Sequence, residues 1–471
     1  MRPMRNMAYT VLGFMAFLAV WLTFQHSSAA AYRDDPRNVR SFDAPESGRR
    51  GEILSADGVV LARDTPTGGR EYPGGAVWAH LVGSDHPSLD ATGLEATRRT
   101  DMLSRDDGSI TAFFTQIFGG DLGPPSVHLT VSSEVQQAAV AALGSQKGAV
   151  VAIDPRTGAI LAYVSSPSYD PNTLPDTSGV LIGDIDQPLR DRVAGAARPP
   201  GSTFKILVAG SAMETLGLTT DSLLTDGAEY VAPGAGIPIT NAAGGVCGDG
   251  DTVSLIQAIT VSCNTAFARL AVEMGAGPLV EMAERAGFNT TIPWELTAIA
   301  SQIPDASSLD VDPPALAQTA LGERDVRVTP LQMALIAAAV ANDGVAMAPQ
   351  AVESVVAPDG EVLDSLTPAR FARVFPSEVA AGLGQMMVEV VRTGTGRAAG
   401  LPDVQVAGKT GTAAGADGPH AWFVGFAPAD DPVVAIAVLV ESGGRLGDGG
   451  TGGSVAAPIA AAVIAAVVRG G

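Results

Sequence analysis

The sequence predicts an α/β (α+β) fold with one large domain, preceded by a small β-rich module and one transmembrane helix. A β-hairpin is predicted early in the domain, with strands at Gly148–Asp154 and Ala159–Ser165 around the turn residues 155–158. The segment from about Arg190 to Val340 is helical in pattern. Three later strands are expected at Val404–Thr412, Ala421–Phe426 and Val433–Val440. Strands from both ends would assemble into one sheet, so we expect a single domain over residues 146–471.

Helices are expected to cover this sheet. One is predicted at Val131–Leu143, with Thr130 or Ser132 as its N-cap. Two more begin at the proline-containing segments 199–201 and 329–331, because proline is tolerated in the first turn of a helix.

The end of the chain combines a glycine-rich loop with an apolar helix. The run Val455–Val468 is short, rich in alanine and interrupted by Pro458, so we expect a buried core helix. The preceding loop, Gly443–Gly453, lacks the pattern of a phosphate-binding loop and is predicted to be a flexible connection.

The N-terminus, residues 1–29, is predicted to anchor the chain in a membrane. Met7–Phe24 carries no charge and is mostly apolar; at ~1.5 Å per residue, its helix approaches the ~30 Å of a hydrocarbon core. Arg2 and Arg5 precede it, which keeps the N-terminus in the cytoplasm. The alternative is a signal peptide cleaved within Ser27–Ala31, although its apolar region would be longer than is usual. We therefore expect a single-pass cell-membrane protein whose catalytic domain is extracytoplasmic.

Residues 30–145 are predicted to connect the anchor to the large domain. Ala30–Ser47 reads as an extended stalk, and Gly51 to about Pro125 holds short β-like runs among turn residues. This segment is too small and polar for a large core, so we expect a modest β-rich module.

Composition limits the function. The 471 residues are 46% hydrophobic and 17% charged, with a net charge of −21, which indicates a globular chain and argues against nucleic acid as the partner. The two cysteines exclude a four-cysteine zinc site. Outside the cytoplasm, Cys247 and Cys263 are compatible with a disulfide, which would stabilise the fold by about 3 kcal/mol; the alternative is two buried free thiols.

Three lysines stand out among 29 cationic residues, because the other 26 are arginine. Lys205 lies in Ser202-Thr203-Phe204-Lys205, and Lys409 begins Lys409-Thr410-Gly411-Thr412. Ser262-Cys263-Asn264 stands between them, whereas Lys147 reads as an exposed loop charge. Ser-x-x-Lys, Ser-x-Asn and Lys-Thr-Gly in this order are the signature set of penicillin-recognising active-serine enzymes.

The spacing suits nucleophilic catalysis. Ser202 and Lys205, three apart at a helix start, share one face. A serine hydroxyl needs a neighbour to take its proton, and a lysine can do so only as a neutral amine, a state that arginine does not reach. Lys409 could act as a fixed charge that lowers the pKa of Lys205. The five histidines fit neither a Ser-His-Asp arrangement nor a zinc motif.

These residues resemble the penicillin-binding proteins, and the resemblance extends along the chain. It includes residues 148–172 and 199–205, Ala320-Leu321-Gly322 with residues 328–334, and Ala421–Phe426. Upstream, Arg50-Gly51, Tyr72-Pro73-Gly74 and Gly93-Leu94-Glu95 are similar to the N-terminal, dimerisation-like module of class B members, and the whole looks most like the penicillin-binding protein A type. Family members often have Asn-Arg at Asp191-Arg192 and Gly-Gln at Gly322-Glu323.

The resemblance implies a five-stranded, mainly antiparallel sheet flanked by helices, and the D,D-transpeptidation of peptidoglycan stem peptides ending in D-Ala-D-Ala. It implies Ser202 as nucleophile, Lys205 as general base, Ser262 as proton relay and Asn264 as the residue that holds the acyl chain. Lys409, Thr410, Gly411 and Thr412 would bind substrate, and the N–H groups of Ser202 and Thr412 would form the oxyanion hole. β-Lactams would acylate Ser202; no metal or organic cofactor is implied, and a membrane glycan polymerase is a candidate partner.

Two rival functions share these motifs. One is a hydrolase, either a D,D-carboxypeptidase or a class D-like β-lactamase, which would release the acyl group to water. The other is a non-catalytic β-lactam sensor or divisome scaffold. A role at the septum or the side wall, the acceptor amine and the oligomeric state stay open.

Overall fold

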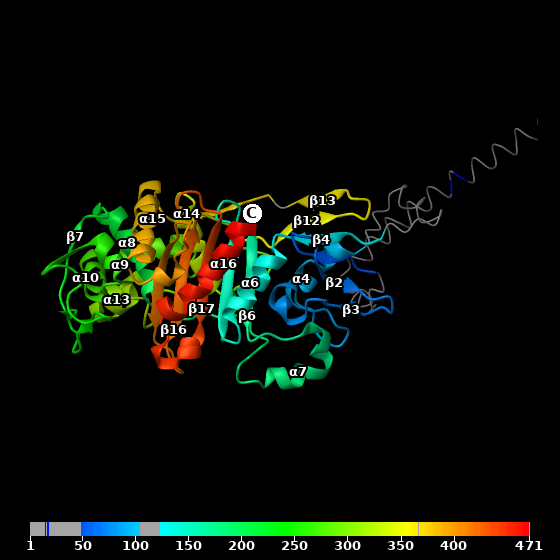
Figure 1. Cartoon of the computed structure of the whole chain (residues 1–471), viewed down its shortest axis with the longest axis horizontal. Coiled ribbons are helices and arrows are strands. Elements are labelled where there is room, and N and C mark those ends of the chain that lie inside the picture. Colours follow the sequence, from blue (N-terminus) through cyan, green and yellow to red (C-terminus); the bar gives the residue numbers. More distant parts are fainter. Residues whose placement is uncertain (1–14, 16, 18–48, 104–122, 366, 471) are drawn as a thin grey trace, which may run out of the picture. The chain divides into compact units, whose positions relative to one another are not determined.

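The computed structural model describes Met15, Phe17 and residues 49–103, 123–365 and 367–470. The rest of the predicted anchor and the stalk lie outside these residues. From Arg50 onward the chain forms one unit, built around a five-stranded antiparallel sheet in the order β15-β16-β17-β5-β6 (Figure 1). Its strands are β5 (Gly148–Ile153), β6 (Ile160–Ser166), β15 (Ala407–Ala413), β16 (His420–Ala427) and β17 (Val434–Val440). The expected sheet, with strands from both ends of the domain, is confirmed.

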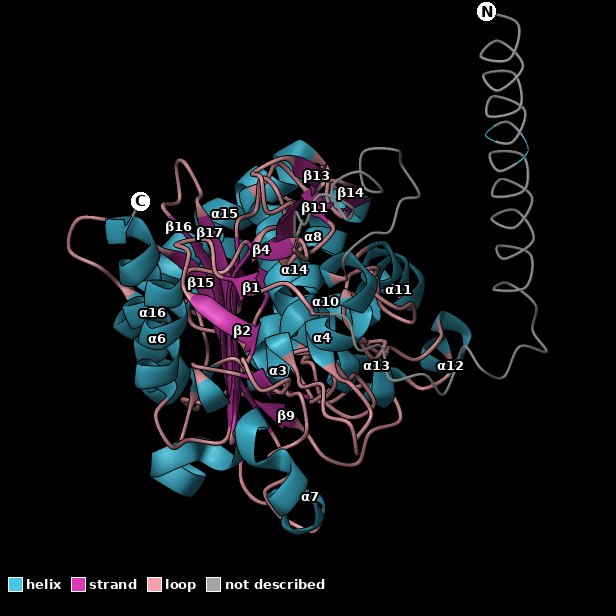
Figure 2. Ribbon diagram, turned by 90° about the vertical axis from the view of Figure 1, so that its right-hand side faces the viewer, coloured by secondary structure: helices cyan, strands magenta, loops and turns pink. Residues whose placement is uncertain are grey.

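The central strands are apolar along their whole length because helices cover both faces of the sheet (Figure 2). Every residue of β17 is buried. On one face lie α6 (Ser133–Leu143) and α16 (Ala457–Gly470), side by side. On the other face α14 (Pro330–Ala341) packs against β5, β16 and β17, while α15 (Ser377–Arg392) contacts β15. Ser132 caps α6 by accepting the N–H of Val135, which selects one of the two N-caps that the sequence allowed.

The helix at the C-terminal end is a core helix, as predicted. Within the described part of the chain, the helical stretch Gly452–Gly470 alone has the length and apolar composition of a membrane span. It begins as the π-helical turn η7 (Gly452–Ala456), continues as α16 and contacts α6, β16 and β17. Its apolar residues therefore pack onto the sheet.

A second sheet at the N-terminal side combines strands of the expected module with a later hairpin. It has six strands in the order β13-β12-β4-β1-β2-β3. The early strands are β1 (Ile53–Leu54), β2 (Val60–Asp64), β3 (Arg70–Glu71) and β4 (Ser126–Leu129). The other two, β12 (Val352–Val356) and β13 (Val362–Ser365), come from more than two hundred residues later. β12 pairs with the edge of β4, whose N–H and C=O groups would otherwise lack partners. The module predicted within residues 30–145 is thus completed by a later hairpin.

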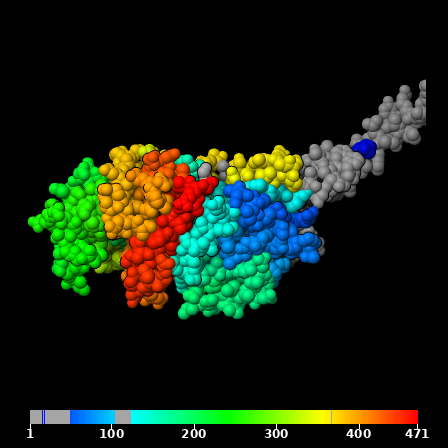
Figure 3. All heavy atoms as spheres, viewed as in Figure 1, coloured from blue at the N-terminus to red at the C-terminus, as the bar shows by residue number. Residues whose placement is uncertain are grey.

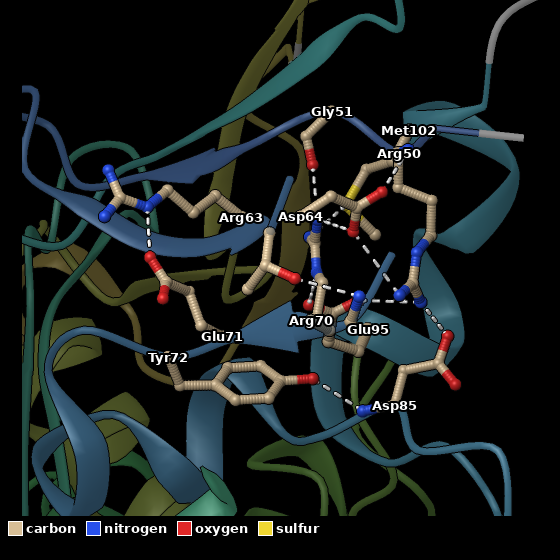
Figure 4. Close-up of polar contacts among 12 residues, drawn as sticks. Arg50, Gly51, Arg63, Asp64, Arg70, Glu71, Tyr72, Asp85, Glu95 and Met102 are labelled. Atoms are coloured by element: carbon tan, nitrogen blue, oxygen red, sulfur yellow. Dashed lines mark hydrogen bonds and ion pairs between the residues drawn. The ribbon is translucent and has the colours of Figure 1, made fainter. Parts of the chain in front are cut away.

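A buried ion cluster joins the short elements of this region (Figure 4). The Nε of Arg70 donates to Glu95 at 2.6 Å, and these side chains are 1% and 0% exposed. Arg70 also donates to Asp64, and Arg50 pairs with Asp85. The Arg50-Gly51 and Gly93-Leu94-Glu95 segments singled out in the sequence therefore meet at one point. Glu95 lies on α4 (Gly93–Thr97), beside α3 (Ala79–Val82) and η2 (Arg99–Met102).

The remaining helices form a lobe beyond β15, at the end of the unit opposite the N-terminal sheet (Figure 3, green). Its helices are α8 (Lys205–Leu216), α9 (Leu255–Thr260), α10 (Asn264–Met274), α11 (Ala276–Arg285), α12 (Ala306–Asp310) and α13 (Pro313–Ala320). Three small two-stranded sheets complete the described fold, from β7 (Leu223–Thr225), β8 (Glu229–Tyr230), β9 (Ile239–Thr240), β10 (Thr252–Ser254), β11 (Val345–Met347) and β14 (Arg370–Arg373). Separately, α7 (Leu174–Ile182) follows β6.

Candidate active site

Ser202 is placed by a tight backbone contact between two elements. It lies on the 3-10 turn η4 (Gly201–Phe204), and Lys205 opens α8 directly after it. Gly201 has φ +54°, and a Cβ there would lie 2.7 Å from the carbonyl oxygen of Thr412. Only glycine lets this turn approach β15 so closely. The Ser-x-x-Lys segment is therefore held against the Lys-Thr-Gly strand.

Lys205 is fully buried and faces the Ser-x-Asn segment. Its Nζ donates to the carbonyl oxygen of Ser262 at 2.8 Å and to Oδ1 of Asn264 at 2.7 Å. The Oγ of Ser262 is 3.4 Å away. Burial lowers the pKa of Lys205 well below its ordinary value of 10.5, and the charge of Lys409 lowers it further. A neutral amine has two N–H groups, which the two carbonyl oxygens can accept, and its lone pair stays available for a proton.

Lys409 reaches the same serine from the sheet. Its Nζ lies 2.9 Å from the Oγ of Ser262 and donates to the carbonyl oxygen of Thr410. Burial lowers the pKa of Lys409 to about 7. Its charge lowers the pKa of Lys205, as expected, and its role as a fixed charge in catalysis stays a prediction.

The Ser-x-Asn segment is held by an unusual backbone and a cross-link. Ser262 has φ +61°, a left-handed conformation, and it sits between the end of α9 and the start of α10. Cys263, the N-cap of α10, forms a disulfide with Cys247. Asn241 accepts the N–H of Asn264, which further ties the neighbouring loop to this segment.

Asp226 and the two cysteines form the one cluster of potential metal ligands among the described residues. Both sulfurs are bonded to each other, whereas a metal needs a thiolate. Asp226 instead accepts the backbone N–H groups of Cys247 and Gly248.

The predicted residues meet at one cleft of about 530 Å³. Its lining includes Ser202, Ser262, Asn264, Thr410, Gly411 and Thr412. Lys205 and Lys409 lie just beneath the lining and are hydrogen-bonded to Ser262. Cys247 and Cys263 lie outside the lining and support Ser262 and Asn264 through the disulfide.

Some lining residues were not expected from the motifs. The Oγ1 of Thr395 lies 2.6 Å from that of Thr410, and Thr451 and Ser454 cap each other at the start of η7. The loop Gly443–Gly453, predicted to be only a flexible connection, therefore contributes residues to the lining of the cleft at its end. Glu323 also lines the cleft and had been noted only as a departure from the family pattern. No local pattern marks Thr395 or Thr451, because only the fold brings them to β15.

A sequence profile of the penicillin binding protein transpeptidase domain matches residues 148–465. The chain belongs to this family. It is 39% identical to the peptidoglycan D,D-transpeptidase PbpA of Mycolicibacterium smegmatis, with 99% of each chain covered. The identity to the Mycobacterium tuberculosis protein of the same name is 37%, again over 99% of each chain.

Solved structures agree with this placement. The penicillin G acyl-enzyme complex of penicillin-binding protein A from M. tuberculosis is 37% identical, with a TM-score of 0.81 over 90% of this chain and all of the other. Pseudomonas aeruginosa PBP2 is 30% identical, with a TM-score of 0.75 over 90% of this chain and 97% of the other. The resemblance to class B penicillin-binding proteins of the A type, and the transpeptidase fold that it implied, are confirmed.

Proposed function

We propose that this chain is a serine-type peptidoglycan D,D-transpeptidase that cross-links stem peptides through an acyl-enzyme on Ser202. The proposal rests on one observation, the position of two buried amines beside one hydroxyl. The Nζ atoms of Lys205 and Lys409 lie 3.4 and 2.9 Å from the Oγ of Ser262, at the cleft that Ser202 lines. Relatives named D,D-transpeptidases and a penicillin G acyl-enzyme of a similar protein support it.

In the first half-reaction, the Oγ of Ser202 attacks the carbonyl carbon of the penultimate D-Ala while its proton passes to Lys205. The backbone N–H groups of Ser202 and Thr412 stabilise the resulting oxyanion, which contributes about 3–4 kcal/mol in comparable sites. The C–N bond then breaks, and the leaving amine of D-Ala takes a proton by way of Ser262. Cationic Lys409, with Thr410, Gly411 and Thr412, holds the terminal carboxylate, and Asn264 holds the acyl chain.

In the second half-reaction, an amine of a neighbouring stem attacks the ester. A C–N bond forms, the ester C–O bond breaks, and the proton that the attacking amine loses returns to the Oγ of Ser202. A β-lactam follows the first half-reaction alone, because its cleaved amide stays attached and does not leave the cleft. Slow deacylation separates this function from the rival β-lactamase activity, and transfer to an amine in preference to water separates it from the rival carboxypeptidase activity.

Labelling of the full-length protein with a fluorescent penicillin tests this proposal. We expect a stable adduct on the peptide that contains Ser202, located by mass spectrometry, and at least a 100-fold loss of labelling in Ser202→Ala. With a D-Ala-D-Ala stem and a stem acceptor, we expect a cross-linked product. An adduct on another residue, rapid turnover of the penicillin, or release of D-Ala without cross-linking would each contradict it.

We propose further that residues 7–24 anchor the protein in the cytoplasmic membrane with the catalytic domain outside, where it works beside a membrane glycan polymerase. The uncharged run of Met7–Phe24 after Arg2 and Arg5 supports the orientation. Fusion of a reporter that is active only outside the cytoplasm should give signal when placed after Gly470, and no signal when placed before Met7. The reverse pattern would contradict this topology.

A further inference from the structure

Glu323 is a carboxylate at the cleft that the proposed catalytic steps do not use. The residue before it, Gly322, has φ +73°, and its carbonyl oxygen accepts the N–H of Gly201 at 2.9 Å. A Cβ at Gly322 would lie 2.1 Å from the carbonyl oxygen of Gly201, so these two backbones touch. Ser202 follows Gly201 and Glu323 follows Gly322, so the two side chains start from the same point of the cleft wall.

The carboxylate is directed to the far end of β15. Its Oε1 accepts the N–H of Ala414 at 3.2 Å, two residues beyond Thr412. Lys409 and Thr410, which would bind the terminal carboxylate of the substrate, lie at the other end of this stretch of strand. A substrate anchored at Lys409 and bonded to Ser202 therefore extends its acyl side past Thr412 toward Glu323.

This carboxylate has no cationic partner. Within residues 49–103, 123–365 and 367–470, no Lys, Arg or His nitrogen lies within 4 Å of its oxygens. Arg327, whose charge lowers the pKa of Glu323, donates from its Nη1 to the carbonyl oxygens of Arg324 and Val326. Arg324 pairs with Asp312.

Burial raises the pKa of Glu323 to about 7, while the Ala414 N–H and Arg327 oppose the rise. Beyond β15, burial lowers the pKa of His420 on β16, with Arg198 acting in the same direction. Lys409 is hydrogen-bonded to Ser262, so neither His420 nor Lys409 neutralises the carboxylate of Glu323. A half-buried anion in a binding cleft is stabilised by a cation that the substrate brings.

We propose that Glu323 is a specificity residue that binds an ammonium group on the acyl side of the substrate. The proposal rests on the function proposed above. Stem peptides that cross-link to one another each carry an acceptor amine in addition to the D-Ala-D-Ala end. A donor stem held by Lys409 therefore presents its own free amine toward Glu323, and the residue favours donors in which that amine has not yet been acylated.

Two penicillins that differ by one amine test this inference. Ampicillin carries an ammonium group on its acyl side chain, and benzylpenicillin has hydrogen there. We would measure the acylation rate constants of both with the full-length protein, by competition against a fluorescent penicillin, in wild type, Glu323→Gln and Glu323→Asp. Glutamine keeps the shape and removes only the charge, and aspartate keeps the charge on a shorter side chain.

We expect the ratio of the ampicillin rate to the benzylpenicillin rate at pH 7.5 to fall roughly three- to tenfold in Glu323→Gln, the size of one partly buried ion pair. The benzylpenicillin rate should stay within about twofold, and Glu323→Asp should keep part of the preference. The difference in this ratio between wild type and Glu323→Gln should be smaller at pH 6, because the carboxyl, whose pKa is about 7, is then mostly protonated.

An unchanged ratio in Glu323→Gln would overturn the inference, as would an equal slowing of both penicillins, which would indicate a structural role. Because each ratio is measured in one preparation, a partly unfolded variant does not alter it. Failure of wild type to react with either penicillin would instead overturn the proposed function and this inference with it.

Discussion

Replacement of Lys205 by arginine is expected to slow acylation by a fluorescent penicillin at least about 100-fold, the usual contribution of a general base. The guanidinium keeps the positive charge but does not give up its proton at any pH in use. Lys205 is fully buried, and burial together with the charge of Lys409 lowers its pKa, which favours the neutral amine. Arginine would also place a permanent charge beside Lys409, where the described residues offer two carbonyl oxygens and a hydroxyl but no carboxylate.

Lys147→Arg is the matched control. Lys147 is partly exposed, and its Nζ lies 3.4 Å from Asp186, at a distance that arginine can also span. We expect labelling to stay within about twofold of wild type, since a surface ion pair of this kind contributes little. Circular dichroism should show both variants folded. Near-normal labelling of Lys205→Arg would exclude Lys205 as the base.

Glu95→Ala is expected to lower the free energy of unfolding by about 3–5 kcal/mol, because it leaves the charge of Arg70 buried and without its main partner. The two side chains are 0% and 1% exposed, and the hydrogen bond between them is 2.6 Å long. Burial raises the pKa of Glu95 and the charge of Arg70 lowers it, so each of the two buried charges depends on the other. Urea denaturation of the full-length protein would measure the loss.

The same close-up contains the control, the exposed pair of Arg63 and Glu71 (Figure 4). These side chains are 50% and 39% exposed, so Glu71→Ala should change the free energy of unfolding by less than about 1 kcal/mol. Equal losses in Glu95→Ala and Glu71→Ala would refute the buried cluster as a source of stability. Penicillin labelling at low denaturant should be retained in both, since neither residue lines the cleft.

Much of the fold follows from local patterns. The hairpin of β5 and β6, the three late strands and the N-cap Ser132 can be read from alternation, turn residues and capping preference, all of which act over a few residues. The boundary of the N-terminal sheet cannot be read in this way. β4 pairs with β12 across more than two hundred residues, and no short-range property of Ser126–Leu129 specifies that partner.

The candidate site shows the same division. The sequence by itself determined the residue types and their order: a serine three residues before a lysine, a second serine with its asparagine, and a Lys-Thr-Gly strand, in a chain with only three lysines. Spacing along one helix start predicts that Ser202 and Lys205 share one face, because that relation is local.

Only the tertiary structure decided how these segments act together. It placed Ser262 between two buried amines, and burial, a property of the whole fold, lowers the pKa of both Lys205 and Lys409. It also placed the carboxylate of Glu323, a one-residue departure from the family pattern, in the cleft beside the N–H of Ala414 at the end of β15. Desolvation and contacts between distant segments arise only when the chain packs. A linear pattern therefore identifies the chemical groups, and the packed fold sets their charge and the groups that they contact.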